Sequence, residues 1–129
     1  MKITGVCILT DNIQEMKDFY VQAMDVKIDG DDKFVIVLAK GMVFSLCDFS
    51  IMETMAPGSM DGSGNGRYTL EVKVKNADEQ YKKLKDLGIP IVKPPTTQSW
   101  GRRSVWCRDP DGNIVNFYHT VKRNSTAWI

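Results

Sequence analysis

The chain has 129 residues, 43% of them hydrophobic, and carries a net charge of +1. This charge does not indicate nucleic-acid binding, no apolar run approaches the ~20 residues of a membrane helix, and the first residues lack the pattern of a signal peptide. Three widely spaced cysteines are typical of reduced thiols, so we expect a cytoplasmic protein that binds neither nucleic acid nor membrane.

Residues 1–49 are predicted to form a strand, a helix and three further strands. Residues 5–13 alternate with the period of a strand and reach Asn12, which together with Glu15 has the spacing of a helix cap. A helix is therefore expected over 13–24. Its expected buried side consists of Ile13, Met16, Tyr20 and Met24. The strands expected after it are 26–29, 33–39 and 42–49.

Residues 50–66 are rich in Gly and Ser and are predicted to be a linker. A plain connector is one interpretation. Three methionines in this segment, Met52, Met55 and Met60, leave open a second one, in which the linker closes as a lid over a ligand, because methionine adapts to varied apolar shapes.

Residues 67–121 repeat the pattern of the first 49. Another alternating segment reaches Asn76, and Glu79 again completes the spacing of a helix cap. A helix is expected over 77–87, and Gly88 is its predicted stop. Its expected buried side consists of Ala77, Tyr81, Leu84 and Leu87. The strands expected after it are 89–93, 103–108 and 113–119.

The fold is therefore predicted to be α+β, with two tandem βαβββ modules (1–49 and 67–121) in a single domain. Each module is too small to bury much core alone, so we expect the two to share a sheet or to pack as a pair. Strand parity predicts that Met42, Phe44 and Leu46 face a helix. The residues predicted on the opposite faces are Gly5, Cys7, Leu9, Val43, Ser45, Cys47, Thr69, Glu71, Lys73, Ser104, Trp106, Ile114, Asn116 and Tyr118.

Two segments, NIQEMKDFYVQAM and WGRRSVWCRDPDGNIVNFYH, are similar to the first helix and the closing hairpin of a known family. The chain resembles, over nearly its whole length, the vicinal oxygen chelate superfamily of glyoxalase I, bleomycin resistance proteins and extradiol dioxygenases. The resemblance implies that the strands of both modules curl into a mixed sheet around a common cleft. In metal-using members, His or Glu side chains from four strands bind one divalent ion there.

The positions that the resemblance assigns to metal ligands are Gly5, Ser45, Thr69 and Asn116. None of these residue types is a preferred ligand of a transition metal, so we expect neither a metal nor a cofactor. The single histidine, His119, is predicted to face the helix. Glu71, Cys7 and Cys47 together leave a zinc site open, and the alternative is a paired carboxylate with two buried thiols.

The residues expected to contact a ligand combine aromatic rings with a few polar groups, as small-molecule sites do. They are Cys7, Ser45, Thr69, Glu71, Trp100, Arg102, Trp106, Asn116 and Tyr118. Trp100 and Trp106 would stack on a planar ligand, and Arg102 would bind its carboxylate or phosphate. Core packing of Trp106 and solvation of Arg102 at the rim are the alternatives. Asn116 would bond either the ligand or a neighbouring strand residue.

The function favoured by these residues is metal-independent binding of a small organic molecule, in the manner of the bleomycin resistance proteins. Those proteins bind a cationic drug, whereas this cleft offers Glu71 against Lys73 and Arg102, which argues against the drug itself. One alternative is a glyoxalase-like lyase or dioxygenase with an atypical site and Glu71 as general base. Another is a structural or regulatory protein with a vestigial cleft.

A homodimer is expected, since the resemblance implies symmetric pairs with the cleft often near the interface. The apolar end of the tail (122–129), at residues 126–129, would prefer the surface of a partner to water. An acidic first module and a basic second module would also attract each other. The alternative is a monomer whose modules pair internally.

Overall fold

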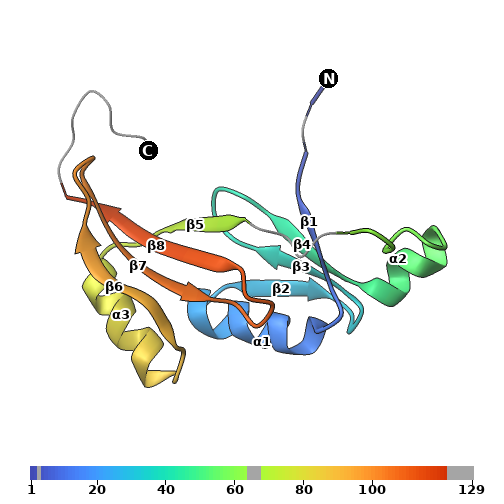
Figure 1. Ribbon diagram of the computed structural model, residues 1–129, viewed down its shortest axis with the longest axis horizontal. Coiled ribbons are helices and arrows are strands. Elements are labelled where there is room, and N and C mark those ends of the chain that lie inside the picture. The colour runs from blue at the N-terminus through green and yellow to red at the C-terminus, as the bar shows by residue number, and fades with distance from the viewer. Residues whose placement is uncertain (3, 64–67, 122–129) are drawn as a thin grey trace. The chain divides into compact units, whose positions relative to one another are not determined.

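The computed structural model describes residues 1–2, 4–63 and 68–121. The chain divides into two compact units, Met1–Asn65 (unit 1) and Gly66–Ile129 (unit 2). Each unit contains a βαβββ module with its own four-stranded mixed sheet (Figure 1). The predicted α+β class with two tandem modules is therefore confirmed.

Unit 1 contains, in chain order, β1 (Cys7–Thr10), α1 (Ile13–Met24), β2 (Lys27–Gly30), β3 (Phe34–Leu38), β4 (Phe44–Asp48) and α2 (Phe49–Met55). Its strand order is β1-β4-β3-β2. β1 runs parallel to β4, and the other neighbours are antiparallel. α1 begins and ends at the predicted residues, because the apolar spacing of this segment is regular.

One side of α1 is buried in the core of unit 1. Its buried residues are Ile13, Met16, Phe19, Tyr20 and Ala23. The Tyr20 ring lies edge-on to Phe19 and Phe44, at centroid distances of 5.1 and 5.5 Å. The prediction that Met24 lies on this side is wrong: Met24 is half-buried, because Ala23 continues the i, i+3, i+7, i+10 spacing that starts at Ile13.

Within β4, the side chains alternate between the two faces of the sheet as predicted. Phe44 and Leu46 are buried. Met42 is exposed, contrary to the prediction, because β4 begins only at Phe44 and the preceding residues lie outside the sheet. Alternation of side chains places a residue on a face only where the backbone is extended.

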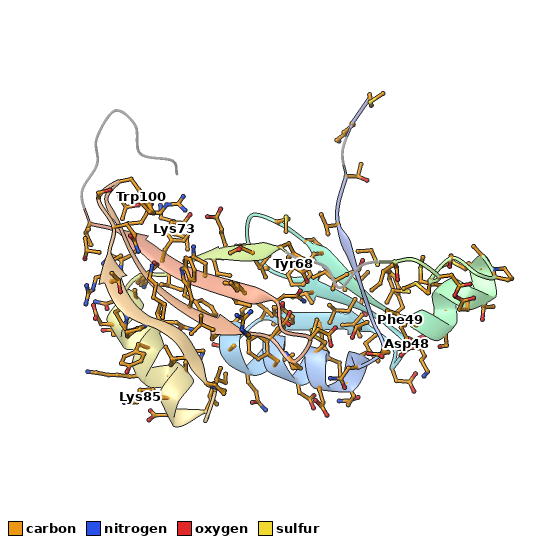
Figure 2. The ribbon with its side chains drawn as sticks, in the orientation of Figure 1. Asp48, Phe49, Tyr68, Lys73, Lys85 and Trp100 are labelled. Carbon is orange, nitrogen blue, oxygen red and sulfur yellow. The ribbon has the colours of Figure 1, made fainter. Side chains whose placement is uncertain are left out.

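Unit 2 contains β5 (Thr69–Lys73), α3 (Ala77–Asp86), β6 (Ile91–Thr97), β7 (Arg102–Arg108) and β8 (Ile114–Thr120). Its strand order, β5-β8-β7-β6, repeats that of unit 1, with β5 parallel to β8. α3 covers one face of this sheet. Figure 2 shows Lys85 of α3 on one side of the sheet and Lys73 of β5 on the other.

The burial of α3 agrees only in part with the prediction. Ala77 and Leu84 are buried, and Tyr81 is half-buried with the Lys85 ammonium 5.1 Å from its ring centroid. Leu87 is exposed, contrary to the prediction. The reason is that the helix ends before it, at Asp86, and the chain then turns away through Gly88.

Gly88 has φ +73° and ends α3 as predicted. Its N–H donates to the Lys85 carbonyl at 2.9 Å, and the Ile89 N–H donates to the Leu84 carbonyl at 3.0 Å. These two bonds satisfy carbonyls that the end of a helix would otherwise leave unpaired.

The two helix caps that the sequence predicts differ in the structure. The Asn76 side chain accepts a hydrogen bond from the Glu79 N–H at 3.1 Å, so the predicted cap of α3 is confirmed. Asn12 makes no side-chain cap, and that prediction is wrong. Its own N–H donates to Thr10 Oγ1 at 2.9 Å, and its amide nitrogen donates to the Glu15 carboxylate at 3.1 Å.

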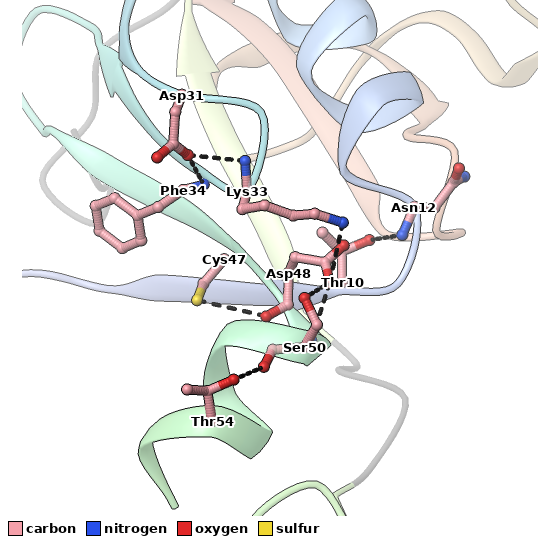
Figure 3. A network of polar contacts seen from close by, with 9 residues as sticks. All are labelled: Thr10, Asn12, Asp31, Lys33, Phe34, Cys47, Asp48, Ser50 and Thr54. Atoms are coloured by element: carbon pink, nitrogen blue, oxygen red, sulfur yellow. Dashed lines mark hydrogen bonds and ion pairs between the residues drawn. The ribbon is translucent and has the colours of Figure 1, made fainter.

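The predicted linker contains a short helix, α2, which the sequence did not reveal. Asp48 caps it by accepting from the backbone N–H and the hydroxyl of Ser50, at 2.9 and 2.7 Å (Figure 3). These bonds hold the pKa of Asp48 below its ordinary value. Glu53 of α2 accepts from the backbone N–H groups of two residues beyond the helix, Gly58 and Met60, at 2.7 and 3.1 Å. Residues 48–60 are therefore held by polar contacts among themselves.

Two predicted regions fall outside the described residues in whole or in part. They are the end of the linker (64–66) and the tail (122–129). In the part of the chain that the structure describes, no helix is both long enough and apolar enough to cross a membrane.

Candidate functional site: the far face of the unit 2 sheet

The face of the unit 2 sheet opposite α3, here called the far face, carries most of the predicted site. Two contacts show which face α3 covers. His119 Nδ1 of β8 accepts from the Ala77 N–H at 2.8 Å, and Arg103 of β7 pairs with Asp78. His119 therefore faces the helix, as predicted, and residues that alternate with it and with Arg103 lie on the far face.

Four side chains form a row across all four strands of the far face. The register pairs Glu71 of β5 with Asn116 of β8, Asn116 with Trp106 of β7, and Trp106 with Lys93 of β6. The next row consists of Lys73, Tyr118, Ser104 and Thr96. Residues paired across neighbouring strands stand close enough for their side chains to interact. Strand register thus gathers predicted site residues that are far apart in the sequence.

Arg102 connects the two rows. Its Nη1 lies 3.0 Å from Glu71 Oε1, and its guanidinium carbon lies 3.8 Å from the centroid of the Tyr118 ring. Simple solvation of Arg102 at a rim is therefore wrong: only 11% of its side chain is exposed, against 56% for Glu71. Glu71 is the paired carboxylate of the sequence alternatives, because its Oε1 accepts a hydrogen bond from the guanidinium.

The Trp106 indole lies beneath a lysine. The Lys93 ammonium is 4.4 Å from the ring centroid, a cation–π contact. Burial lowers the pKa of Lys93, because a desolvated ammonium is less stable than a hydrated one. Lys93 was not singled out from the sequence. Its position opposite Trp106 depends on two irregularities in the β6–β7 register, which the sequence does not reveal.

Three buried side-chain polar atoms within the described residues lack a hydrogen-bond partner. They are the Tyr68 hydroxyl, Trp106 Nε1 and Asn116 Oδ1. The last two belong to directly paired residues in the middle of the far face. Buried polar groups are normally bonded, so a neighbouring donor and acceptor without partners mark a place where another molecule could bind.

Tyr68 lies next to β5 and was missed in the sequence. Burial, together with the charges of Asp109 and Asp111, raises the pKa of its phenol, so the group is a neutral donor. The only available signal was its position beside Thr69, at the start of a predicted strand.

The remaining predicted residues of unit 2 lie at different depths. Ser104 and Tyr118 are buried in the second row, and Thr69 is exposed on β5. Trp100 is 48% exposed in the connection between β6 and β7, where Figure 2 shows it at the end of the hairpin. The structure therefore brings Trp106, and not Trp100, into the row with Glu71 and Asn116.

Two predicted site residues, Cys7 and Ser45, belong to unit 1. They are directly paired between β1 and β4. The expectation of two buried thiols is wrong for Cys7, which is exposed, whereas Cys47 is buried. Burial, with a smaller contribution from Cys7, raises the pKa of the Cys47 thiol. Cys47 Sγ lies 3.6 Å from the Asp48 carbonyl oxygen (Figure 3).

The residues at the family's metal positions do not fit a divalent transition metal. These positions are Gly5, Ser45, Thr69 and Asn116, which offer a hydrogen atom, two hydroxyls and an amide. Across residues 1–2, 4–63 and 68–121, no three His, Cys, Asp or Glu side chains are gathered in a way that could hold a metal ion.

The succession of two βαβββ modules, with the closing hairpin β7–β8, is matched by one family model. The model of the Glyoxalase/Bleomycin resistance protein/Dioxygenase superfamily covers residues 2–117. The chain belongs to this superfamily. A relative in Bacillus subtilis (strain 168), described as the uncharacterized protein YraH, is 25% identical over 92% of this chain and 98% of its own.

Solved structures of the superfamily have the same fold. A glyoxalase/bleomycin resistance protein/dioxygenase from Nocardioides is similar with a TM-score of 0.78 and 18% identity, over 100% of this chain and 89% of that one. A lactoylglutathione lyase from Agrobacterium tumefaciens is similar with a TM-score of 0.71 and 18% identity, over 92% of each chain. At this level of identity the likeness extends to the fold alone.

Proposed function

We propose that this superfamily member binds a small planar organic molecule, without a metal, on the far face of unit 2. The observation that carries the proposal is the unpartnered donor of Trp106 beside the unpartnered acceptor of Asn116. A ligand that bonds both would remove the cost of two buried, unsatisfied polar groups. The indole N–H points outward in the plane of its ring, so such a ligand would meet the edge of the indole.

The charges of the far face favour a neutral or anionic ligand. Lys73, Lys93 and Arg102 stand against Glu71, whose carboxylate is already bonded to Arg102. A cationic drug would have to displace this guanidinium. The proposal therefore follows the bleomycin resistance proteins in their manner of binding and not in their ligand.

The two alternatives receive less support. A glyoxalase-like lyase or a dioxygenase would need a catalytic group, and Glu71, the carboxylate of the central row, is occupied by Arg102. In a structural or regulatory protein with a vestigial cleft, a buried donor and acceptor without partners would only lower stability. An apolar pair of the same shape would be more stable at these positions.

Further parts of the proposal concern assembly and location. We propose that the chain forms a homodimer, and that residues 50–66 act as a lid over the bound ligand or as a plain connector. The dimer is supported by exposed apolar residues of unit 1, namely Val6, Phe34, Leu38, Met42 and Val43. A cytoplasmic location is supported by three free thiols.

NMR of the indole N–H groups tests ligand binding directly. A library of planar aromatic fragments is titrated into the ¹⁵N-labelled protein, with the signals assigned from Trp106→Phe and Trp100→Phe. We expect binding fragments to shift the Trp106 signal and to leave that of Trp100 in place. A library that never shifts the Trp106 signal would favour the vestigial alternative.

Two measurements test metal independence and the dimer. Elemental analysis after dialysis without chelator should find no stoichiometric divalent metal, and one tightly held ion per chain would contradict the proposal. Light scattering should give twice the mass of one chain, and a mass of 14.6 kDa that persists on concentration would mean a monomer.

A further inference from the structure

We infer that the far face of unit 2 recognises a planar ring with adjacent N–H and C=O groups, as in a lactam. This inference rests on the proposed function and adds the class of ligand. It follows from the kinds of hydrogen bond that the two unpartnered groups, Trp106 Nε1–H and Asn116 Oδ1, can make.

The two groups are complementary to the adjacent N–H and C=O of a lactam edge. An indole N–H only donates, and the oxygen of a primary amide only accepts. A ligand carboxylate offers two acceptors and would leave Asn116 Oδ1 unpaired, whereas an amine offers donors and would leave the Trp106 N–H unpaired. The C=O and N–H of a lactam would satisfy both at once.

Strand register sets the two groups side by side. Asn116 and Trp106 are directly opposite in the antiparallel pair β7–β8, so their side chains leave the sheet from neighbouring points on the same face. Both residues are half-buried although the two polar atoms are buried. The covering groups therefore have to move before a ligand can bind.

Lys93 is a suitable cover. Its ammonium lies over the indole, and it is held there by a flexible stem of four carbons. Burial lowers its pKa, so moving the ammonium into water restores hydration that it lacks in the resting structure. Once Lys93 has moved, the edge of a planar ligand would meet the indole N–H, which points outward in the plane of the ring. The Arg102 guanidinium, stacked on Tyr118, flanks this position on the same face.

Isosteric probes test the inference on the intact wild-type protein. Oxindole carries both N–H and C=O, 2-indanone has the C=O alone, indole has the N–H alone, and benzoate has two acceptors. Dissociation constants are measured by isothermal titration calorimetry, which also serves the variants, and the Trp106 indole signal shows whether each probe binds at this face of the wild-type protein. We expect oxindole to bind about tenfold or more tightly than each of the other three, because each leaves a buried group unpaired.

Two variants separate the two hydrogen bonds. Trp106→Phe keeps an aromatic ring and removes the donor, so oxindole should lose its advantage over indole and keep its advantage over 2-indanone. Asn116→Leu removes the acceptor, so the pattern should reverse. Trp100→Phe is the matched control and should change neither ratio. Melting curves show whether each variant is folded. The comparison of the four probes on the wild-type protein does not depend on the variants.

The outcomes separate this inference from the proposed function. If other fragments shift the Trp106 signal while oxindole has no advantage, the lactam inference is wrong and the binding function stands. If benzoate binds best, the amide of Asn116 donates instead, and the inference is again wrong. If no compound affects Trp106, both proposals fail.

Discussion

In unit 1, the sheet face opposite α1 carries Leu9, Cys47 and Phe34 in one cross-strand row, and Cys7, Ser45, Ile36 and Asp29 in the next. In unit 2, the corresponding face carries the row Glu71, Asn116, Trp106 and Lys93. The strand order and the parallel pairing are the same in both sheets. The repeated topology therefore does not repeat the chemistry: this row of unit 2 combines charged, amide and aromatic side chains, whereas the rows of unit 1 consist mainly of small and apolar ones.

The difference shows how a duplicated fold can divide its roles. Most helix-facing residues of both sheets are apolar, because each unit has to bury a core against its own helix. The opposite faces have no such requirement, so their residues are free to differ. If the far face of unit 2 serves binding, substitutions on it should cost less stability than substitutions of the residues that face α3.

The largest difference in stability is expected between a residue on the helix side of the unit 2 sheet and a residue on its far face. Phe117 is fully buried beneath α3, so Phe117→Ala should lower the free energy of unfolding by ~3–5 kcal/mol. Trp106 is half-buried on the far face, so Trp106→Ala should cost about 1–2 kcal/mol. Denaturant unfolding measures both. Equal losses would mean that Trp106 is a core residue and that the two faces do not differ in role.

Arg102→Ala should lower the free energy of unfolding by about 1–2 kcal/mol, mostly through the lost contact with Tyr118. The ion pair itself should add little, since more than half of the Glu71 side chain is exposed and solvent screens it. Glu71→Gln is the matched control and should cost less than ~1 kcal/mol. A larger loss for Glu71→Gln than for Arg102→Ala would mean that the ion pair, and not the stacking, holds Arg102.

The two helix caps sharpen the comparison of the units. Asn76→Ala should cost ~1 kcal/mol, because it removes the bond to the Glu79 N–H at the start of α3. Asn12→Ala should cost less than ~0.5 kcal/mol, since the Asn12 side chain caps nothing. Thermal melts of the two variants measure the difference. Equal shifts in melting temperature would show that the two asparagines stabilise their helices equally.

Acid should weaken each unit through an aspartate of its own. Two bonds from Arg103, at 2.8 and 2.9 Å, hold the pKa of Asp78 in unit 2 below its ordinary 3.8, and backbone N–H groups of Lys33 and Phe34 do the same for Asp31 in unit 1. A carboxyl with a lowered folded-state pKa stabilises the fold above its unfolded pKa. This stabilisation is lost as the pH falls through the lower, folded-state value.

Unfolding measured from pH 5 downward tests this effect. The free energy of unfolding should fall as the pH drops below the ordinary aspartate pKa, and Asp78→Asn or Asp31→Asn should each make the fall shallower. A variant with the same pH dependence as the wild type would show that its carboxylate contributes nothing to acid stability.

Much of the fold follows from local patterns in the sequence. The range of α1, the Gly88 stop and the burial of Phe44 and Leu46 were predicted correctly, because apolar periodicity and glycine conformation act within a few residues. Parity within strands also placed Glu71, Trp106 and Asn116 on one face, since alternation needs only an extended backbone. α2 was missed, because seven residues without a buried side carry too little periodicity.

The sequence alone determined the two modules, the parity of their strands and the absence of metal-ligand types at four positions. Only the tertiary structure decided the contacts of the far face. The bond of Arg102 to Glu71 joins residues 31 positions apart, and the Lys93 ammonium reaches Trp106 across two shifts of register. Such contacts depend on which strands pair and in which register, and on where long side chains end. The same dependence explains why the sequence could not reveal the unpartnered Trp106 Nε1 and Asn116 Oδ1. A polar atom is known to lack a partner only when all of its neighbours in the folded protein are known.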